Sequence, residues 1–464
     1  MAVEDIEEQS IHEQFEQLIA TEDKLAIRDF LDDQNIADVA DLINEYPDYE
    51  SQIIANLSIH RAASTFKILD FPTQKRIVSE LPSFKTAELL NELPADDRVA
   101  FLEELPTSTV RELIKTLDPE ERKITLELMG YPENSVGRLM TPDYVYVFEY
   151  NTVNEVLQTI RRYGTNTETI DVIYVINEKG ELLDDIRIKD FILSAPEVRV
   201  NELMDNRYIS LNVNDDQEVA NDIFKMNNRV ALPVTDNNRI LLGIVTIDDV
   251  LWVANEEFSE DIQKIGGTEA LDAPYLDIGI FKLVKKRASW LVILFVGEML
   301  TATAMQFFQK EIEAATVLAL FIPLIMSSGG NSGSQASTLI IQAMALGELT
   351  ITDWWRVMRR ELISGLLLGV ILGTIGYFRI VIWQNLHIFD YGPYWQLVAA
   401  TIFFSLIGIV LWGSMMGSML PIILKKFKFD PAASSAPFVA TLVDVTGILI
   451  YFSVAYFFLK GILL

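Results

Sequence analysis

Residues 434–459 read SSAPFVATLVDVTGILIYFSVAYFFL, an apolar stretch long enough to cross a membrane, with one carboxylate, Asp444, near its middle. An ionised carboxylate at mid-bilayer costs at least about 2.5 kcal/mol, so its presence needs a reason. At helical spacing around it lie small or polar residues: Pro437, Ala440, Thr441 and Gly447. Such a face suits a water-filled path, in which a lone acid attracts a cation. The alternative is a carboxylate that is paired or protonated in place, but no Lys or Arg lies in mid-span to pair with it.

Charge divides this chain of 464 residues into two parts. Nine basic and nine acidic residues follow residue 288, so the net charge of −29 lies wholly in residues 1–288. We therefore predict a soluble, strongly acidic front part and a near-neutral membrane domain in a lipid bilayer. So acidic a surface argues against nucleic acid as a partner, because phosphate contacts need Lys and Arg.

The composition also narrows the chemistry. The chain has no Cys and three His, which excludes disulfides and thiolate sites and argues against a multi-histidine zinc or copper site. Oxygen ligands must then dominate any metal site, which favours a hard cation such as Mg²⁺ or Ca²⁺. Residues 1–30 are acidic and show no signal peptide. We find no nucleophile–base pair, catalytic metal motif or dinucleotide loop, so we do not expect an enzyme.

Residues 1–136 are predicted to form an all-α N-terminal domain. A Leu-Pro element recurs every twelve residues, at Leu81, Leu93 and Leu105, and returns as Leu-Asp-Pro at Leu117. Each Pro suits the first turn of a short helix, and amphipathic stretches fill the intervals. Repeated short helices at a fixed period indicate a small α-solenoid.

Residues 137–254 look duplicated. The predicted copies span 137–200 and 201–254, and each contains a short strand, a helix, an apolar strand, a turn and a closing helix. The run LPV at 232–234, followed by GIVTIDDV at 243–250, resembles the end of a CBS (cystathionine β-synthase) domain. We therefore predict an α/β tandem CBS pair. The first copy matches less well, because Asp184-Asp185-Ile186 stands where a small residue usually begins the strand.

Residues 255–288 are predicted to be a connector, and residues 289–464 a transmembrane domain of five helices. Gly266-Gly267 interrupts the connector, so we expect more than one helix there. The predicted spans are about 289–308, 316–346, 360–382, 395–424 and 434–459. Lys and Arg gather before the first span and between the second and third and the fourth and fifth. We therefore predict a multi-pass protein of the cell's inner (plasma) membrane. The positive-inside rule places its N-terminus in the cytoplasm and its C-terminus outside.

The second predicted span carries a polar run, SSGGNSGSQ, at residues 327–335. It can break the helix beside a wet cavity, or it can be a small-residue packing seam between helices. Packing explains the Gly and Ser residues but not Asn331 and Gln335 together, so both interpretations stay open. A phosphate-binding loop is excluded, because no Lys follows the glycines. Glu298 in the first span is a weaker candidate for lining a pore.

These residues carry a resemblance to a known family. The run from Gly329 to Gln335, the segment from Asp430 to Gly447 and the domain order together resemble the MgtE family of magnesium channels and transporters. The resemblance implies a homodimer with a pore on its two-fold axis, in which Asp444 of both subunits holds a largely hydrated Mg²⁺. The pore set that it implies, together with the candidates above, is Asp444, Ala440, Thr441, Gly330, Asn331, Ala436 and Glu298.

The resemblance also implies cytosolic Mg²⁺ sites that close the pore. The ligands matched to the family pattern are Asp96, Asp216, Glu218, Asp249, Glu257, Glu260 and Asp261. The chain departs from that pattern at Ala100, Asn228 and Trp252, where acidic ligands are expected, and at Ala436, where a pore-lining Asn is expected. We expect acidic faces to repel when Mg²⁺ is scarce and to be bridged by ions when it is plentiful.

Two other functions remain open at this stage. One is transport of another divalent cation, Mn²⁺, Co²⁺ or Ca²⁺, although the scarcity of His and Cys disfavours soft or borderline ions. The other is a membrane-anchored CBS-domain sensor without transport, which would leave Asn331 and Asp444 unexplained. CBS pairs often bind adenine nucleotides, and Asp248 or Asp249 would then meet a ribose.

Overall fold

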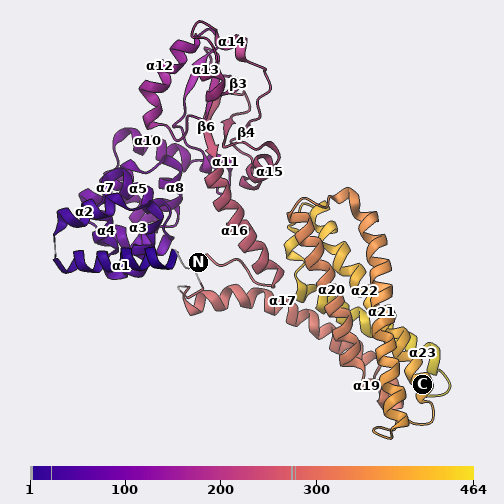
Figure 1. Cartoon of the computed structure of the whole chain (residues 1–464). Coiled ribbons are helices and arrows are strands. Elements are labelled where there is room, and N and C mark those ends of the chain that lie inside the picture. Colours follow the sequence, from indigo (N-terminus) through magenta and orange to yellow (C-terminus); the bar gives the residue numbers. More distant parts are fainter. Residues whose placement is uncertain (1–3, 22, 273–274, 277, 464) are drawn as a thin grey trace. The chain divides into compact units, whose positions relative to one another are not determined.

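The computed structural model describes residues 4–21, 23–272, 275–276 and 278–463 (Figure 1). The chain divides into two compact units, Met1–Ala254 and Asn255–Leu464. Each unit has its own buried core, so each is described by itself.

Short helices stacked on one another make up the first part of unit 1 (Figure 1). They are α1 (Glu4–Thr21), α2 (Lys24–Asp33), α3 (Ile36–Glu45), η1 (Pro47–Tyr49), α4 (Glu50–Asn56), α5 (Ile59–Lys67), α6 (Phe71–Glu80), α7 (Ser83–Glu92), α8 (Ala95–Glu103), α9 (Thr107–Thr116) and α10 (Pro119–Leu128). Helices two apart in sequence pack together, as α3 does with α5 and α5 with α7. This arrangement confirms the helical N-terminal domain.

The Leu-Pro repeat sets where these helices end and begin. The four leucines of the repeat are buried in one core and follow the last turn of a helix. Pro82, Pro94 and Pro106 stand at the N-cap position, one residue before the predicted first turn, whereas Pro119 occupies that turn. Each repeat therefore buries an apolar anchor and restarts the helix within a few residues.

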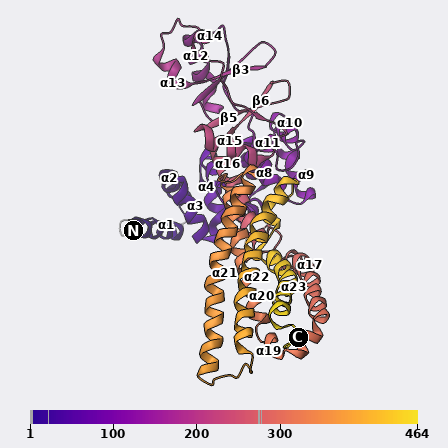
Figure 2. The same cartoon turned by 90° about the vertical axis from the view of Figure 1, so that its right-hand side faces the viewer.

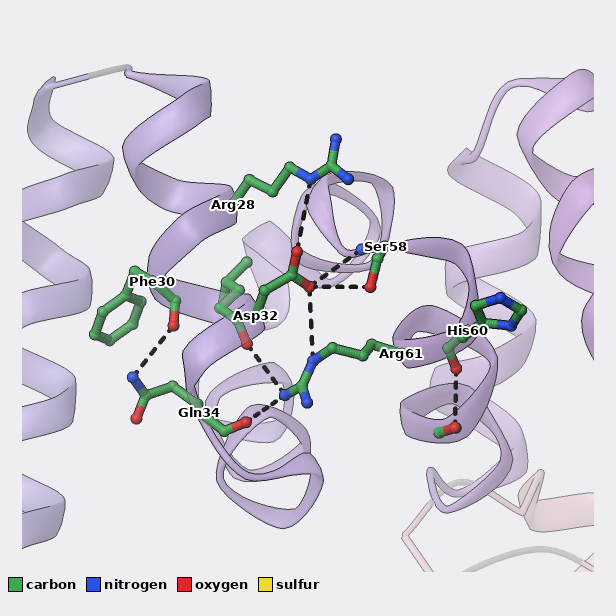
Figure 3. A network of polar contacts seen from close by, with 9 residues as sticks. Arg28, Phe30, Asp32, Gln34, Ser58, His60 and Arg61 are labelled. Atoms are coloured by element: carbon green, nitrogen blue, oxygen red, sulfur yellow. Dashed lines mark hydrogen bonds and ion pairs between the residues drawn. The ribbon is translucent and has the colours of Figure 1, made fainter. Parts of the chain in front are cut away.

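A polar network joins α2 to the start of α5 (Figure 3). The Asp32 carboxylate accepts hydrogen bonds from the backbone N–H and the hydroxyl of Ser58, both at 3.2 Å. Arg28 and Arg61 each pair with Asp32, with the Nε atom 3.6 Å from a carboxylate oxygen. Arg61 also donates to the backbone carbonyls of Leu31 and Gln34 at the end of α2. These bonds satisfy carbonyls that the helix end leaves without intrahelical donors.

The second part of unit 1 contains two similar three-stranded sheets. Its elements are α11 (Val136–Leu139), β1 (Tyr146–Phe148), α12 (Val153–Tyr163), η2 (Gly164–Asn166), β2 (Val172–Ile176), β3 (Leu182–Arg187), α13 (Ile188–Leu193), α14 (Val200–Leu203), β4 (Leu211–Asn212), α15 (Gln217–Asn227), β5 (Ala231–Thr235), β6 (Leu241–Thr246) and α16 (Ile247–Ile265). In both sheets the first pair of strands is parallel and the second antiparallel. The predicted duplication is confirmed.

The two copies differ where β3 and β6 correspond. Asp184 is 1% exposed, and its carboxylate accepts the backbone N–H groups of Asp205 and Asn206 at 2.8 and 2.9 Å. Asp185 pairs with Arg229 of the second copy at 2.8 Å. The acidic pair that weakens the match of the first copy therefore ties the two copies together.

Helix α8 packs against the second copy. Ala95 and Val99 of α8 are buried in one apolar cluster with Leu128 of α10 and with Leu211 and Phe224 of the second copy. Burial of apolar surface of this kind contributes to holding two bodies together. The helical domain and the CBS pair thus share a core at this junction.

Unit 2 contains five helices, or helix groups, that are long and apolar enough to span a membrane, counted over the described residues. They are α17 (Ile280–Phe307), α19 (Thr316–Ala319) with α20 (Ile322–Ala345), η3 (Ile351–Asp353) with α21 (Trp354–Asn385), α22 (Trp395–Lys426) and α23 (Ala436–Leu459). Two short elements, α18 (Gln309–Ala314) and η4 (Pro431–Ala433), complete the unit. The predicted five-helix organisation is confirmed. The connector holds the end of α16, which stops before Gly266, and the start of α17.

A seam of glycines joins α20 to α22, which also runs alongside α21 (Figure 2). A Cβ atom on Gly417 would lie 2.0 Å from the carbonyl oxygen of Gly333, and one on Gly413 would lie 2.4 Å from that of Gly329. Real Cβ atoms do not approach this closely, so the two backbones touch where side chains would normally separate them. Helix α20 is continuous, and the predicted alternative of a broken helix is wrong.

Candidate functional site: the carboxylate of α23 and the acidic junction

Side-chain hydrogen bonds fix the start of α23. Asp430 accepts the backbone N–H of Ala432 at 2.8 Å and so begins η4. Ser337 and Ser334 of α20 donate to the carbonyls of Ser434 and Ala436 at 2.8 and 2.9 Å. These bonds anchor the segment before α23 to α20 and thereby set how far Asp444 lies along the helix axis.

Helix α17 supplies a second anchor for α23. The indole N–H of Trp290 donates to the Ser435 hydroxyl at 2.9 Å. About two turns further along, the Gly297 backbone lies so close to α23 that a Cβ there would be 2.9 Å from a methyl carbon of Thr441. Thr441 thus lies at the contact of α17 with α23, and its hydroxyl donates to the Pro437 carbonyl at 3.1 Å.

The structure brings Asp444 together with three of the other predicted pore residues, Gly330, Ala440 and Glu298. A Cβ built on Gly330 would lie 3.3 Å from the Ala440 Cβ and 3.9 Å from Asp444 Oδ1. The lack of a side chain at Gly330 therefore lets α20 pack closely against Ala440 beside the Asp444 carboxylate. Asp444 is half-buried, and the carboxylate of Glu298 is close enough to interact with it electrostatically.

The polar run of α20 divides between two faces. Its glycines and Ser332 are buried against α22 and α23, where Ser332 and Ser414 share a hydrogen bond of 2.8 Å. Asn331 and Gln335 are one turn apart and exposed, and the Asn331 amide donates to Ser327 at 3.4 Å. The small residues of the run therefore form a packing seam, and the amides of Asn331 and Gln335 form a polar face on the opposite side of an unbroken helix.

Five carboxylates meet at the junction of α8 with the CBS pair. Asp96 and Asp97 begin α8, and the others are Glu168, Asp248 and Asp249. Lys67, the last residue of α5, lies among them, with its Nζ 3.5 Å from Asp97, 3.8 Å from Glu168 and 3.7 Å from Asp248. We call this group the junction cluster. The sequence matched Asp96 and Asp249 to regulatory ligands, and the structure places both here.

Burial and mutual repulsion raise the pKa values of three acids in the junction cluster. Burial raises the pKa of Asp97 to about 6, against the opposing field of Lys67. Burial also raises the pKa of Asp249 to about 7, although a hydrogen bond from Thr246 opposes the shift. The pKa of Asp96 rises well above its usual range because of burial and then the Asp249 charge. Folding therefore concentrates negative charge that needs a proton or a cation beside it.

Among the acids of the junction cluster, Asp96 gives the strongest indication of a bound cation. It is 6% exposed, and its Oδ1 atom is buried without a hydrogen-bond partner. A buried, unsatisfied carboxylate oxygen fits a hard cation. Yet among the residues described here, no three acidic or histidine side chains converge closely enough to hold a metal ion.

The other predicted regulatory residues lie in two places. Asp216 is the N-cap of α15, where its carboxylate accepts the Glu218 backbone N–H at 3.0 Å. Glu257, Glu260 and Asp261 share the C-terminal part of α16, and burial, with the Asp430 charge, raises the pKa of Asp261 to about 6.

Lys264 connects this end of α16 to the turn before α23. Its ammonium lies 2.6 Å from an Asp430 carboxylate oxygen and also pairs with Glu260. The sequence did not single out Lys264, Lys67 or Glu168, because Lys264 meets Asp430 and Lys67 meets Glu168 only in the folded chain, across 166 and 101 positions. Only Asp430 had a local signal, since an Asp before Pro is typical of a helix start.

Three protein-family models match this chain. Residues 322–454 match the family model MgtE, described as a divalent cation transporter, and residues 34–134 match the MgtE intracellular N domain. Residues 136–196 and 200–256 each match a CBS domain.

Two curated relatives match the sequence of this chain over most of their length. The magnesium transporter MgtE of Thermus thermophilus is 40% identical over 349 residues, which cover 75% of each chain. That of Bacillus subtilis is 28% identical over 440 residues, covering 94% of this chain and 95% of its own. A solved structure of the cytosolic domain of the Mg²⁺ channel MgtE in complex with ATP is 32% identical, with a TM-score of 0.50; it matches 52% of this chain and 98% of its own.

Proposed function

This chain belongs to the MgtE family of divalent cation transporters, and from that membership we propose that it carries Mg²⁺ across a membrane through a site built on Asp444. The observation that supports the site is a half-buried carboxylate in a membrane helix, with the Gly330 backbone beside it and no basic partner among the described residues. Such a carboxylate is costly in lipid unless a cation and water accompany it.

The ion is selected through its water. Mg²⁺ loses its hydration shell reluctantly, so a carboxylate that contacts the bound waters recognises it without stripping them. Ala436 supplies only a backbone carbonyl, which Ser334 already engages, so Asp444 carries more of the selectivity than it would with an amide at that position.

The driving force is the membrane potential. A negative interior favours entry of a divalent ion by about 4.6 kcal/mol per 100 mV, twice the value for one charge. No other energy source is required. This direction assumes the orientation that the loop charges favour, with the N-terminus in the cytoplasm and the C-terminus outside the cell membrane.

The pore is completed by a second copy of the chain. Asn331, Gln335 and Glu298 are polar yet exposed on membrane helices of one chain, and such groups need protein or water around them. In a homodimer, Thr441 and Ala440 of each copy then line the same path as both Asp444 carboxylates. Two carboxylates also match the charge of the ion.

Regulation by Mg²⁺ resides in the cytosolic parts. We assign the helical domain to 1–136, the CBS copies to 137–200 and 201–254, and the connector to 255–288. Cytosolic Mg²⁺ then bridges acids near the junction cluster and near Glu257 and Asp261 on α16. The buried Oδ1 of Asp96 supports the first of these positions. Asp216 and Glu218 contribute at the start of α15.

An adenine nucleotide is a second ligand of the CBS pair in this proposal. It is supported by the 32% identical cytosolic domain that was solved with ATP. Asp249 and Thr246, at the start of α16, are the residues that would hold its ribose. The nucleotide acts as a ligand, because the chain is a transporter and not an enzyme.

The experiment that tests the function is Mg²⁺ uptake into liposomes containing the purified chain or its Asp444→Ala variant. Uptake that follows an imposed potential, and is lost in the variant, is the expected result. Equal uptake by both proteins would overturn the assignment of Asp444. Competition by Mn²⁺, Co²⁺ and Ca²⁺ in the same assay distinguishes a Mg²⁺-selective pore from a broader divalent cation transporter. If no ion is transported, the remaining function is a membrane-anchored CBS-domain sensor.

A further inference from the structure

Lys67 lies among carboxylates of other elements and has no ion-pair partner on its own helix among the pairs described. Its ammonium is three-quarters buried and lies 3.5 to 3.8 Å from carboxylates on three different elements. No single one of these distances is that of a tight ion pair, so the ammonium is shared among the three. A shared cation between carboxylates of separate elements is the arrangement that a bridging metal ion produces.

The elements that meet at Lys67 belong to different parts of unit 1. Lys67 ends α5 and Asp97 lies in the first turn of α8, both in the helical domain. Glu168 precedes β2 in the first CBS copy, and Asp248 lies in the first turn of α16. One side chain thus links the helical domain to both copies. Burial disfavours its charge, but the carboxylates around it outweigh that effect and raise the pKa of Lys67, so it is a permanent cation.

The surrounding residues are arranged for a cation and lack a full metal site. The Oδ1 atom of Asp96 is buried and unpartnered, yet Ala100, one turn further along α8, has no carboxylate to offer. No three acids of the described residues converge on one point. The position that remains between the acids is the one that Lys67 occupies.

We propose that Lys67 is a resident cation that holds the helical domain against the CBS pair when Mg²⁺ is absent, and so replaces part of the metal dependence of this junction. This inference rests on the proposed regulation by Mg²⁺ and specifies how it operates in this chain. The consequence is that α5 and α8 stay docked in Mg²⁺-free conditions. Mg²⁺ then acts mainly at the other acidic positions, on α15 and α16.

The test measures docking directly in the full-length chain. The chain has no Cys, so Ser83→Cys on α7 and Lys189→Cys on α13 place two spin labels at exposed positions without background. Dilution of the labelled chain with excess unlabelled chain isolates distances within one molecule. Distance distributions are then recorded in EDTA and in excess Mg²⁺ for the unaltered junction, Lys67→Met, Lys67→Arg and the control Lys75→Met, which removes an exposed lysine of α6.

The unaltered junction, Lys67→Arg and Lys75→Met are expected to give one narrow distribution in both conditions. Lys67→Met is expected to lower the docked-to-undocked ratio roughly tenfold in EDTA, as loss of three partly buried ion pairs implies, and to recover in Mg²⁺. Recovery also shows that the variant is folded.

Three results would overturn the proposal: a narrow distribution for Lys67→Met in EDTA, undocking of the unaltered junction in EDTA, or failure of Mg²⁺ to restore docking while Lys67→Arg stays docked. Mg²⁺ uptake into liposomes by the same proteins keeps the two questions apart. If uptake persists and Lys67 proves unimportant, only this inference fails. If there is no uptake in any protein, the proposed function fails.

Discussion

The carboxylate of α23 and the acids of the junction cluster differ in the charged groups that surround them. Asp444 is half-buried, and Glu298 is its only charged neighbour among the described residues. Asp97 and its neighbours surround the ammonium of Lys67. A site that must release its ion cannot contain a permanent cation, whereas a site that holds two domains together gains from one. The difference in charge therefore follows the difference in task.

The largest effect is expected from removing the membrane carboxylate. Asp444→Asn keeps the shape of the side chain but removes its charge, so Mg²⁺ uptake into liposomes should fall at least about 100-fold, equivalent to about 2.8 kcal/mol. Glu348→Gln, which removes an exposed acid of the same unit, is the matched control and should retain uptake. If Asp97→Asn at the junction abolished uptake as fully as Asp444→Asn, the contrast between the two sites would be lost.

The next effect concerns the scaffold that positions Asp444. In Gly417→Ala the added methyl group would lie 2.0 Å from the Gly333 carbonyl oxygen, so α20 and α22 must separate. We expect a loss of about 3 kcal/mol in the stability of unit 2, seen as a lower midpoint of thermal unfolding in detergent. Gly279→Ala is the control, because a Cβ there meets no atom of the described residues within 4 Å. Equal midpoints for the two variants would show that the seam is not tightly packed.

A change of pH should alter docking at the junction cluster but not the packing of the glycine seam between α20 and α22. The pKa values of Asp97 and Asp249, about 6 and about 7, lie above the ordinary value of 3.8, so the folded junction binds protons more tightly than the unfolded chain. The stabilisation by these protons is complete below pH 3.8 and is lost as the pH rises through 6 to 7. The docked-to-undocked ratio of Lys67→Met in EDTA should therefore fall about tenfold from pH 5 to pH 8, by the spin-label measurement. A ratio that rises with pH would contradict this sign.

The smallest effect is expected at the end of α16. Lys264 pairs with Asp430 at a partly exposed position, where an ion pair contributes about 0.5 kcal/mol. Lys264→Met should raise Mg²⁺ uptake at low internal Mg²⁺ about twofold, because the end of α16 is held less firmly to the turn before α23. Lys285→Met, at an exposed lysine of α17, should leave uptake unchanged. A twofold decrease for Lys264→Met would show that this contact favours the conducting form.

The sequence predicted what depends on local pattern. The five spans follow from apolar length, the CBS pair from duplicated strand and turn signals, and the short helices from the Leu-Pro period. Asp444 was recognisable because a charge within an apolar stretch is conspicuous.

What the sequence did not predict depends on distant partners. The continuity of α20 through its polar run is set by Gly413 and Gly417 of α22, about 80 positions away, which replace the lost side-chain packing. Lys67 gains its role from acids up to 181 positions later in the chain. Neither pairing leaves a trace in local periodicity, so only the folded arrangement reveals it.

The glycine seam between α20 and α22 also limits how the membrane unit can move. Backbones in direct contact leave no compressible side chains between them, so sliding or rotation of one helix against the other would produce clashes at once. These two helices therefore behave as a single rigid strut. Helix α17, whose side chains are mostly exposed and which touches α23 at Trp290 and Gly297, retains the freedom that the strut lacks. Because α23 is itself anchored to α20, movement of α17 is what would change the width of the proposed path beside Asp444.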